Sequence, residues 1–401
     1  MPIKVLDIDL AEGVNKNDKL ESYSKALVLW RWRGRPLGQS LVSIFNGKLD
    51  DLELLYLASR DTSIRLAKIA LKEYLAIPND SEFIPSRILT YTVIICTHDR
   101  TSYLKKCLDS ICSDVDRSIE VIVVDNAPSD DQTAKLVSEY PVRYVREDRK
   151  GLNWARSRGA LESRSEIVVY TDDDVIVDLN WINGILQPFF DPEIAAVTGL
   201  VMPLELETPA QEQFDSVYRN WRQFERREIS AASISAALAY NVGSGANMAF
   251  RRQIVNKLSL FDSEMDCGTS TYAAGDLYAF YRLLSLGYRI IYNPNAIVWH
   301  QYKKDWNDML KQLYGYNVGA YSFYIRCIFQ HKDILAIYAI LQTLKWQIDL
   351  AISSLSRSPG GVPLDLNVAM LKGTMRAPIA YLLSRRAEKI KLKMKSQAGS
   401  Q

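Results

Sequence analysis

Residues 166–174 read EIVVYTDDD, a short apolar run rich in β-branched residues that ends in three aspartates. Such a run is typical of a strand that is buried on both faces of a sheet. Helical segments separate it from other runs of the same kind, and one segment carries Leu104, Leu108 and Ile111 on a single stripe. This alternation predicts βαβ units, and therefore an α/β fold with a mostly parallel central sheet and helices on both faces. The other runs are YTVIICT at 91–97, EVIVVD at 120–125 and VRYV at 142–145.

Residues 1–88 depart from this alternation, and we predict that they form an accessory module. Two β-rich runs flank a Pro/Gly turn signal at 33–38. A helix is expected to begin at Asp61 or Thr62 and to end at Pro78. The two runs are ALVLWRW and SLVSIF, and the apolar face of the helix is predicted to hold Ile64, Ala67, Leu71 and Leu75.

Residues 306–401 are predicted to be a helical extension of the main domain, which we assign to 89–305. Between Ile334 and Leu341 apolar residues lie on nearly every side, so this helix is expected to be buried or to lie against something apolar. The end of the chain is basic, a pattern typical of a solvated end, with contact to anionic lipid as the alternative. Its charged residues after Tyr381 are Arg385, Arg386, Lys389, Lys391, Lys393 and Lys395 against Glu388.

The composition is balanced and argues against several classes of protein. The 401 residues hold 49 Lys and Arg against 47 Asp and Glu, a net charge of +2, so no basic field favours nucleic acid as a partner. Five cysteines occur without a C-x-x-C pair, which disfavours structural zinc and fits a reducing compartment. The first residues lack the apolar core of a signal peptide, and no apolar stretch reaches the roughly 18 residues of a spanning helix. We therefore predict a cytoplasmic protein, with the inner face of the membrane as a further location.

Polar side chains are expected to meet at one rim of the sheet, because the carboxyl ends of parallel strands lie together. The strand ends read THDR at 97–100, DN at 125–126 and DDD at 172–174. Three adjacent acids repel one another, and carboxylate oxygens are the ligands that Mg²⁺ and Mn²⁺ prefer. The sequence therefore predicts a divalent metal at this rim, although a solvated acidic turn would give the same pattern.

No phosphate-binding loop follows the first strand, and GSGAN at 243–247 lacks the third glycine of a dinucleotide fingerprint. Phosphates would then be neutralised by an ion on Asp174 and by Arg156 from the helical segment 151–163. His300 ends an apolar run and either completes the metal shell or is a hydrogen-bonded structural residue. The absence of G-x-S-x-G disfavours a nucleophilic hydrolase.

Asp276 follows a run of small residues at the start of an amphipathic helix. A carboxylate in this position commonly caps the helix, and spacing alone favours that interpretation. The same position also suits a general base that accepts a proton from a hydroxyl group.

Seven motifs in this order resemble a family 2 glycosyltransferase of the GT-A fold, which is Rossmann-like. They cover about residues 90–305 and read TVIICTHDR, VIVVDNAPSD, GLNWARSRGA, VVYTDDDV, GSGANMAFRR, AAGDLYAFYRLL and NPNAIVWH. The resemblance implies a nucleotide-diphosphate sugar as donor, Mn²⁺ or Mg²⁺ as cofactor, and an inverting transfer to an acceptor hydroxyl group.

The resemblance also implies roles for individual residues. Asp276 would be the general base, which reverses the interpretation as a helix cap. Asp172, Asp174 and His300 would hold the metal. Two positions depart from the family pattern, since Gly275 replaces a glutamate and Ser157 an asparagine. The nucleotide would be bound by Thr97, Asp99, Asp125, Asn126, Arg156, Asp172 and Asp173, and Gly245, Ala246 and Asn247 would line the donor-sugar and acceptor side.

We therefore expect a hexosyltransferase that acts in polysaccharide or glycoconjugate assembly, on a carbohydrate or lipid-linked acceptor, with peripheral membrane contact. A sugar nucleotidyltransferase is one alternative, but it would need a glycine-rich loop after the first strand. An inactive glycosyltransferase-like scaffold is the other, and the four acids Asp172–Asp174 and Asp276 argue against it. Tyr218, Trp221 and Phe224 are spaced like one helix face, which favours core packing over an acceptor cleft.

Overall fold

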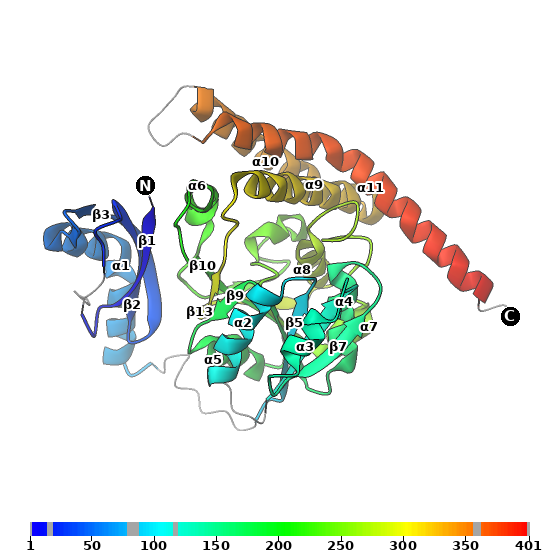
Figure 1. Ribbon diagram of the computed structural model, residues 1–401, viewed down its shortest axis with the longest axis horizontal. Coiled ribbons are helices and arrows are strands. Elements are labelled where there is room, and N and C mark those ends of the chain that lie inside the picture. Colours follow the sequence, from blue (N-terminus) through cyan, green and yellow to red (C-terminus); the bar gives the residue numbers. More distant parts are fainter. Residues whose placement is uncertain (1, 14–18, 78–87, 115–118, 356–361, 399–401) are drawn as a thin grey trace.

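The computed structural model describes residues 2–13, 19–77, 88–114, 119–355 and 362–398. Within them, a small sheet lies at the N-terminal end, a nine-stranded sheet forms the centre, and long helices lie across one end of the central sheet (Figure 1).

One half of the central sheet consists of the four strands that the sequence predicts. All four are parallel to their neighbours in this half. Thr97 pairs with Asp125, and Cys96 pairs with Asp172, so three polar strand ends lie side by side. The strands are β5 (Tyr91–Thr97), β6 (Glu120–Asn126), β7 (Arg143–Glu147) and β8 (Ile167–Asp172).

The other half is mixed, and the sequence analysis identified only the end of its longest strand. β12 (Asn247–Arg251) runs antiparallel between β8 and β10 (Ile194–Pro203), and β13 (Arg289–His300) is parallel to β10. β9 (Val175–Val177) and β11 (Arg227–Ile229) both pair antiparallel with β13. The order is β11-β13-β10-β12-β8-β5-β6-β7, with β9 beside β13. Because only β9, β11 and β12 oppose the other strands, the prediction of a mostly parallel sheet is confirmed.

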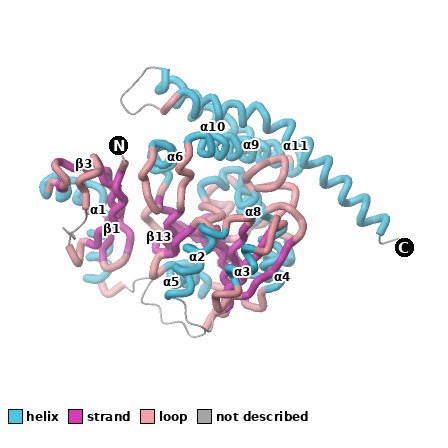
Figure 2. The backbone as a smooth tube through the Cα atoms, viewed as in Figure 1, coloured by secondary structure: helices cyan, strands magenta, loops and turns pink. Residues whose placement is uncertain are grey.

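Helices cover both faces of this sheet, also as predicted (Figure 2). Neighbouring residues of β5 belong to opposite cores, because side chains alternate along a strand. Ile94 shares a core with Phe280, and Val93 shares the other with Leu108. The helices are α2 (Thr101–Asp114), α3 (Gln132–Val137), α4 (Leu152–Glu162), α5 (Trp181–Leu186), α6 (Pro209–Tyr218), α7 (Arg252–Leu258) and α8 (Gly275–Ser285), with 3₁₀ turns η1 (Gln187–Phe190), η2 (Arg219–Trp221) and η3 (Ala236–Asn241).

The N-terminal module is a sheet of four strands covered by one helix. The hairpin turn is shorter than the signal at 33–38 predicts, since β2 ends at Trp32 and β3 begins at Arg35. Gly38 lies inside the second of these strands, and glycine is needed there because a Cβ would come within 2.7 Å of the backbone oxygen of Asp61. β1 is parallel to β2, and β2 is antiparallel to β3. The elements are β1 (Ile3–Asp9), β2 (Lys25–Trp32), β3 (Arg35–Phe45), β4 (Lys48–Leu49) and α1 (Asp51–Tyr74).

The prediction for helix α1 was wrong in its start and in its buried face. The helix begins eleven residues before Thr62, because Asp50 caps it by accepting a hydrogen bond from the backbone N–H of Glu53 at 2.8 Å. Pro78, its predicted end, lies outside the described residues, and the helix ends at Tyr74. The buried residues are Leu54, Leu57, Ala58 and Thr62, whereas the predicted apolar stripe of Ile64, Ala67, Leu71 and Leu75 is exposed.

The N-terminal sheet is buried on both sides. Val28 and Trp30 face helix α1 and share a core with Leu57. Leu27 belongs to a different core, together with Leu200 of strand β10. The alternation along β2 therefore places one face of this strand against α1 and the other against the central domain.

A polar junction fixes the N-terminal sheet on the central domain. The backbone N–H of Ile3 donates to the carbonyl of Leu206 at 2.8 Å. Arg31 is buried and makes ion pairs with Asp7 at 2.7 Å and with Asp178 at 2.6 Å. The two parts of the chain are therefore joined by a continuous core and by a buried ion-pair network.

Three helices follow the central sheet, in agreement with the predicted helical extension. They are α9 (Trp306–His331), α10 (Leu335–Leu355) and α11 (Leu364–Ala398). α11 lies along α9 in an extensive contact, and α10 contacts both (Figure 1). The expected burial between Ile334 and Leu341 is only partly found, since Ala336 and Ala339 are buried but both ends of this range are exposed. Across the described ranges, no helix combines the length and apolar character needed to cross a membrane.

Candidate active site

The three aspartates at the end of β8 have different partners. Asp173 contacts protein groups, whereas Asp172 and Asp174 belong to a group that could hold a metal. Asp173 is almost fully buried and accepts hydrogen bonds from the Thr97 hydroxyl and from Nη1 of Arg100, both at 2.7 Å. Burial raises the pKa of Asp173 to about 7, against the opposing charge of Arg100. The oxygens of Asp173 and the hydroxyl of Thr97 are thus directed at protein partners rather than into a cavity.

Asp172, Asp174 and His300 form a group that could hold a metal. One possible ligand atom from each lies within 4.8 Å of the others. Strand β9 pairs with β13 at Val175 and His300, and this pairing carries the imidazole beside the aspartates. Two carboxylates and one imidazole are a suitable ligand set for Mn²⁺ and a workable one for Mg²⁺.

Three side chains that can carry a positive charge lie around the carboxylate of Asp174. It lies 3.1 Å from Nε2 of His300, 2.5 Å from Nη2 of Arg100 and 4.0 Å from Nζ of Lys303. Burial acts to raise the pKa of Asp174, but His300 and Arg100 outweigh it and lower that pKa. Burial likewise acts to lower the pKa of His300, and the charge of Asp174 reverses this effect and raises it. The site therefore presents an ionised carboxylate to a cation.

Asp125 lies on the same rim, at the end of β6, and keeps one oxygen without a partner. Its Oδ2 accepts a hydrogen bond from the Tyr144 hydroxyl at 2.9 Å, whereas its buried Oδ1 has none. Burial raises the pKa of Asp125, and the Tyr144 hydrogen bond opposes that shift. An unsatisfied buried carboxylate oxygen is costly, and a ligand N–H would satisfy it.

Two other predicted nucleotide residues support the rim rather than face a cavity. The amide of Asn126 donates to the carbonyl of Arg149 at 2.7 Å and accepts from the N–H of Gly151 at 2.8 Å, so its side chain holds the loop before α4. Asp99 has a left-handed backbone, with φ of +52°, and accepts from the N–H of Ser129 at 3.0 Å.

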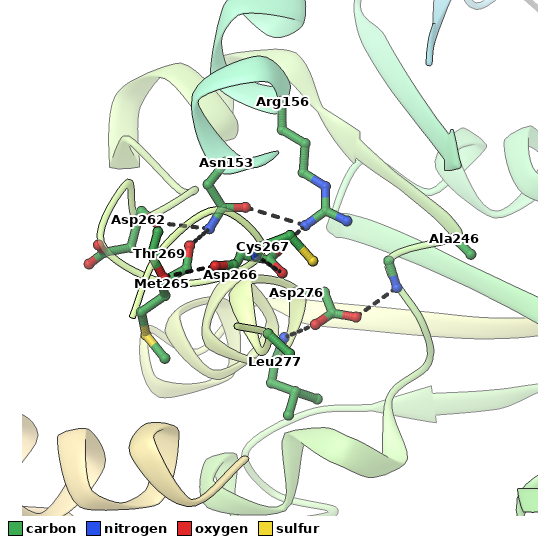
Figure 3. Close-up of polar contacts among 12 residues, drawn as sticks. Asn153, Arg156, Ala246, Asp262, Met265, Asp266, Cys267, Thr269, Asp276 and Leu277 are labelled. Carbon is green, nitrogen blue, oxygen red and sulfur yellow. Dashed lines mark hydrogen bonds and ion pairs between the residues drawn. The ribbon is translucent and has the colours of Figure 1, made fainter. Parts of the chain in front are cut away.

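Asp276 lies at the start of α8 with its carboxylate held by two backbone groups (Figure 3). Oδ2 accepts from the N–H of Gly245 at 2.7 Å, and Oδ1 accepts from the N–H of Leu277 at 2.8 Å. The residue at the N-cap position is Ala274, and no side chain caps this helix. Asp276 therefore connects α8 to the loop before β12, rather than serving as the N-cap residue that spacing alone favours.

A buried ion pair lies beside Asp276 (Figure 3). Arg156 of α4 donates from Nη1 to Oδ2 of Asp266 at 2.6 Å and to Oδ1 of Asn153 at 3.3 Å. Burial raises the pKa of Asp266, whereas the charge of Arg156 acts to lower it. A Cβ at Gly245 would come within 2.6 Å of Nη2 of Arg156 and 3.1 Å of Oδ2 of Asp276, so both groups flank this glycine.

The same cluster explains the glycine at position 275. A Cβ there would come within 2.2 Å of Oδ2 of Asp266 and 2.4 Å of Nδ2 of Asn153. Only glycine leaves room for these two side chains. The carboxylate next to Asp276 is therefore supplied by Asp266, from a loop ten residues earlier in the chain, and not by position 275.

The predicted segment Gly245–Asn247 contributes its first two residues to the cavity. Gly245 and Ala246 line it, whereas Asn247 is fully buried in the sheet. The Asn247 amide donates to the carbonyls of Leu200 and Ala296 at 3.0 and 2.8 Å. Its side chain is thus committed to the core, and this part of the prediction does not match the structure.

The cavity has two lobes that meet at an aromatic wall. One lobe, of about 500 Å³, extends from Asp172, Arg156 and Asp276 to helices α9 and α10. The other, of about 470 Å³, also reaches Asp172 and continues to His300. Tyr218, Trp221, Tyr240 and Tyr316 line both lobes, and Gln342, Thr343 and Trp346 of α10 line the first.

The rings of this wall pack on Trp221 in tilted and edge-to-face contacts. Trp221 lies 5.6 Å from Trp346, 5.8 Å from Tyr240 and 5.9 Å from Tyr218, between ring centroids. Trp221 remains 44% exposed. Core packing was favoured for Tyr218, Trp221 and Phe224; of these, only Phe224 lies wholly in a core, because Tyr218 and Trp221 also line the cavity.

Several residues of this site were not predicted as site residues. Arg100 was visible in the THDR strand end, beside the predicted residues Thr97 and Asp99, but its pairing with the DDD segment depends on the sheet register. Asp266 and Trp346 had no local signal, since each reaches the cavity only through the tertiary fold. Lys303, three residues after His300, could have been identified by its position after a strand end.

The fold is that of the GT-A glycosyltransferases. It is similar to the mannosyltransferase PcManGT from Pyrobaculum calidifontis, whose structure was solved in complex with GDP-Man and Mn²⁺. The TM-score is 0.51 at 18% sequence identity, over 78% of this chain and 93% of that one. Residues 92–259 match the model of the family described as Glycosyl transferase family 2.

Curated relatives agree with this match. The chain is 24% identical over 216 residues to the O-antigen chain rhamnosyltransferase RfbN of Salmonella typhimurium, covering 53% of this chain and 66% of that protein. It is 25% identical over 263 residues to the pre-mycofactocin glycosyltransferase of Mycobacterium tuberculosis, covering 64% of this chain and 52% of that protein. The chain thus spans between about half and two thirds of these relatives' lengths.

Proposed function

We propose that this protein transfers a sugar from a nucleotide-diphosphate sugar to an acceptor hydroxyl group, with inversion, in the assembly of a polysaccharide or glycoconjugate. The observation that carries the proposal is that Asp172, from the metal-capable group, and Asp276 line the same cavity of about 500 Å³. A donor diphosphate at the first and an acceptor hydroxyl group at the second would thus share one cavity.

The nucleoside would bind at Asp125. Its unpaired Oδ1 can accept an N–H from the base, while Tyr144 keeps the other oxygen in place. This ligand bond would satisfy a buried acceptor that has no partner among the described residues. The binding experiment below identifies the base and the sugar of the donor.

Asp172, Asp174 and His300 would hold Mn²⁺ or Mg²⁺. When bound, the ion supplies Lewis-acid stabilisation of the charge that develops on the leaving diphosphate. The GDP-Man and Mn²⁺ named for PcManGT support this assignment. Arg100 and Lys303, which now face Asp174, are also close enough to this rim to contact phosphate oxygens.

Asp276 would act as the general base. Its carboxylate is oriented by two backbone N–H groups, and each of its oxygens retains a lone pair for a further hydrogen bond. The acceptor oxygen would form its bond to the anomeric carbon while its proton passes to Asp276, and the bond from that carbon to the diphosphate oxygen would break. Displacement from the face opposite the leaving group inverts the anomeric configuration.

Asp266 would be a positioning residue. It neutralises Arg156, whose Nη2 lies beside Gly245, the residue that also orients Asp276. Without this counter-charge the buried guanidinium would be free to pair with Asp276 and would compete with the acceptor hydroxyl group for that carboxylate. The Arg156–Asp266 pair thus keeps a cation available for phosphate while limiting its pull on the base.

The aromatic wall would bind the acceptor sugar. Trp221 and Trp346 line the same lobe as Asp276, and sugar C–H faces pack well on such rings. We infer a cytoplasmic location for the reaction, which agrees with the five free cysteines.

A thermal-shift screen tests the donor assignment. UDP-, GDP-, dTDP- and CDP-sugars would each be added with Mn²⁺, with Mg²⁺, or with a chelator. One nucleotide at 100 times its Kd is expected to stabilise the fold by about 2.7 kcal/mol, and only with metal. The Asp125→Asn variant should lose most of this shift, while Asp130→Asn, on an exposed loop near the rim, should keep it. No shift with any donor in a folded sample would contradict the proposal.

A further inference from the structure

Helix α10 carries an apolar face on its outer side. Its large side chains recur at spacings of three, four and seven residues, which places them on one stripe. A helix at a protein surface usually presents charged and polar residues there. The stripe consists of Ile337, Leu341, Ile348, Ile352 and Leu355, which are 47–72% exposed, with Lys345 in its middle.

Helix α11 continues this surface. Its inner side packs on α9 through small residues such as Gly373, whose Cβ would come within 2.4 Å of the carbonyl of Tyr314. Its outer side again bears large apolar residues, including Met375 and Leu382, which are 78% and 64% exposed. Of the large apolar side chains exposed in the described ranges, about half lie between Ile334 and Ile390. Figures 1 and 2 show α9, α10 and α11 as one layer at the edge of the molecule.

The charge on α11 indicates what covers this surface. The helix has eight Lys and Arg residues against Asp365 and Glu388, a net charge of +6. Lys372, Arg376 and Arg386 are exposed beside the apolar residues. Apolar side chains bordered by cations match the chemistry of a bilayer that contains anionic lipids. A second copy of this chain is disfavoured as the occupant, since a two-fold contact would bring two cationic helices together.

We propose that α10 and α11 form a surface that binds anionic lipid bilayers in the plane of the interface. Neither helix is apolar enough to span a bilayer, so the apolar stripes would enter only the headgroup and upper acyl region. The exposed cations Lys372, Arg376 and Arg386 of α11 would contact the lipid phosphates.

This surface adjoins the cavity through a single helix. Gln342, Thr343 and Trp346 of α10 line the 500 Å³ lobe, and Leu341 and Ile348 of the same helix belong to the outer stripe. An amphiphile with its lipid in the bilayer could therefore present its saccharide to Asp276. This second step rests on the proposed function and names the acceptor class as a lipid-linked saccharide.

Vesicle flotation with the full chain tests the lipid surface. Vesicles of phosphatidylcholine with 30% phosphatidylglycerol would be compared with pure phosphatidylcholine, at low and high salt. We expect binding to the anionic vesicles only. The change Arg386→Ala with Lys389→Ala should lower the partition coefficient by about 30-fold, or roughly fivefold for each cation lost. The change Leu341→Ser, Ile348→Ser and Ile352→Ser should lower it by about tenfold or more.

A matched control is available on helix α1. Leu52, Leu55 and Ile64 are 78%, 65% and 71% exposed, and their replacement by serine should leave flotation unchanged. Equal binding to both vesicle types, or equal loss in the α1 and α10 variants, would overturn the proposal. So would light scattering that shows a dimer which the α10 variant dissociates while vesicle binding persists. Donor-induced thermal shifts are measured without lipid, so a failure of flotation does not contradict the proposed function. A failure of the thermal shift, in turn, does not contradict the lipid-binding surface.

Discussion

The two ends of the cavity are built from different kinds of group and from different parts of the chain. At the donor end, carboxylates at strand ends face Arg100 and His300 across ion pairs of 2.5–3.1 Å. At the acceptor end, aromatic rings face one another at 5.6–5.9 Å. The donor end lies mostly within the family match at 92–259, whereas the acceptor end is completed by Tyr316 and Trp346 beyond it.

This difference separates two tasks. Under the proposed function, the charged groups in register on the parallel sheet, with their metal ion, would bind a diphosphate, which is common to many donors. The rings contributed by helices α9 and α10 would recognise a sugar surface, which differs from one acceptor to another. Substitutions at the two ends should therefore change different steps, and substitution of Asp276, which lies between them, should change the transfer step itself.

The largest effect is expected for Asp276→Asn. Loss of the general base should reduce turnover by about 10²–10⁴-fold, while the donor-induced thermal shift stays as in the parent. Asparagine preserves the size of the side chain and one backbone hydrogen bond, so the melting temperature should change little. The measurement is release of nucleoside diphosphate in the presence of acceptor, and unchanged turnover would remove Asp276 from the mechanism.

The second-largest effect is expected for Asp266→Asn, which removes the buried negative charge beside Arg156. Asp266→Asn leaves Arg156 buried without its partner, and breaking a buried pair costs about 3–5 kcal/mol of stability. Asp266 has a φ of +92°, where glycine is favoured, and Gly275 cannot carry a side chain while Asp266 is present. The double change Asp266→Gly with Gly275→Glu should therefore restore much of the stability and of the activity.

Chemical denaturation measures the first part of that prediction, and the pH profile of turnover measures the second. A positioning role for Asp266 predicts that the acid limb of the profile moves in Asp266→Asn and returns in the double variant. If Asp266→Asn unfolded at the same denaturant concentration as the parent, the buried Arg156–Asp266 pair would not contribute to the stability of the fold.

At the donor end, Asp174→Ala should abolish the metal-dependent part of nucleotide binding. About 2.7 kcal/mol of stabilisation at 100 times the Kd would be lost, because one of the three ligand atoms and its charge are gone. Asp308→Ala, an exposed acid on α9, is the control and should keep the full shift. A Mn²⁺-dependent shift that survives in Asp174→Ala would exclude Asp174 as a ligand.

At the acceptor end, Trp346→Ala should produce the smallest effect. Loss of one ring from the wall is expected to raise the acceptor KM by about tenfold, from roughly 1–1.5 kcal/mol of aromatic contact, with donor KM unchanged. Trp32→Ala, in the N-terminal sheet and outside the cavity, serves as the control. A change in donor KM instead would show that the two ends are not separate.

The sequence predicts well where the strand-end residues of the donor end lie, because its information is local. A parallel strand buried on both faces is a continuous β-branched run, and the polar residue that ends it must lie at the rim. Asp125, Asp172 and Asp174 follow from this rule. Strand β10 was missed because IAAVTGLVMP interrupts the apolar run with small residues. The start of helix α1 was misplaced because Asp61 and Thr62, inside the helix, offer the same capping chemistry as Asp50.

The acceptor end could not be predicted in the same way. Trp221 and Trp346 are 125 residues apart in the chain, and only the packing of α10 on η3 and α9 brings them together. Asp266 depends on a loop whose left-handed residue aims its carboxylate at Arg156. Periodicity identifies which face of an element is apolar, but it does not identify the partner of that face.

The two-sided burial of strand β2 has a consequence for how this chain is made. The N-terminal sheet is synthesised first, yet one of its faces is covered by Leu200 and Ile297, and strand β1 is bonded to Leu206. At about 5–20 residues per second, roughly 15–60 s separate the emergence of Ile3 from that of Ile297. During this interval the apolar face of the first sheet has no partner within its own chain, so the nascent protein should depend on a chaperone before its catalytic domain is complete.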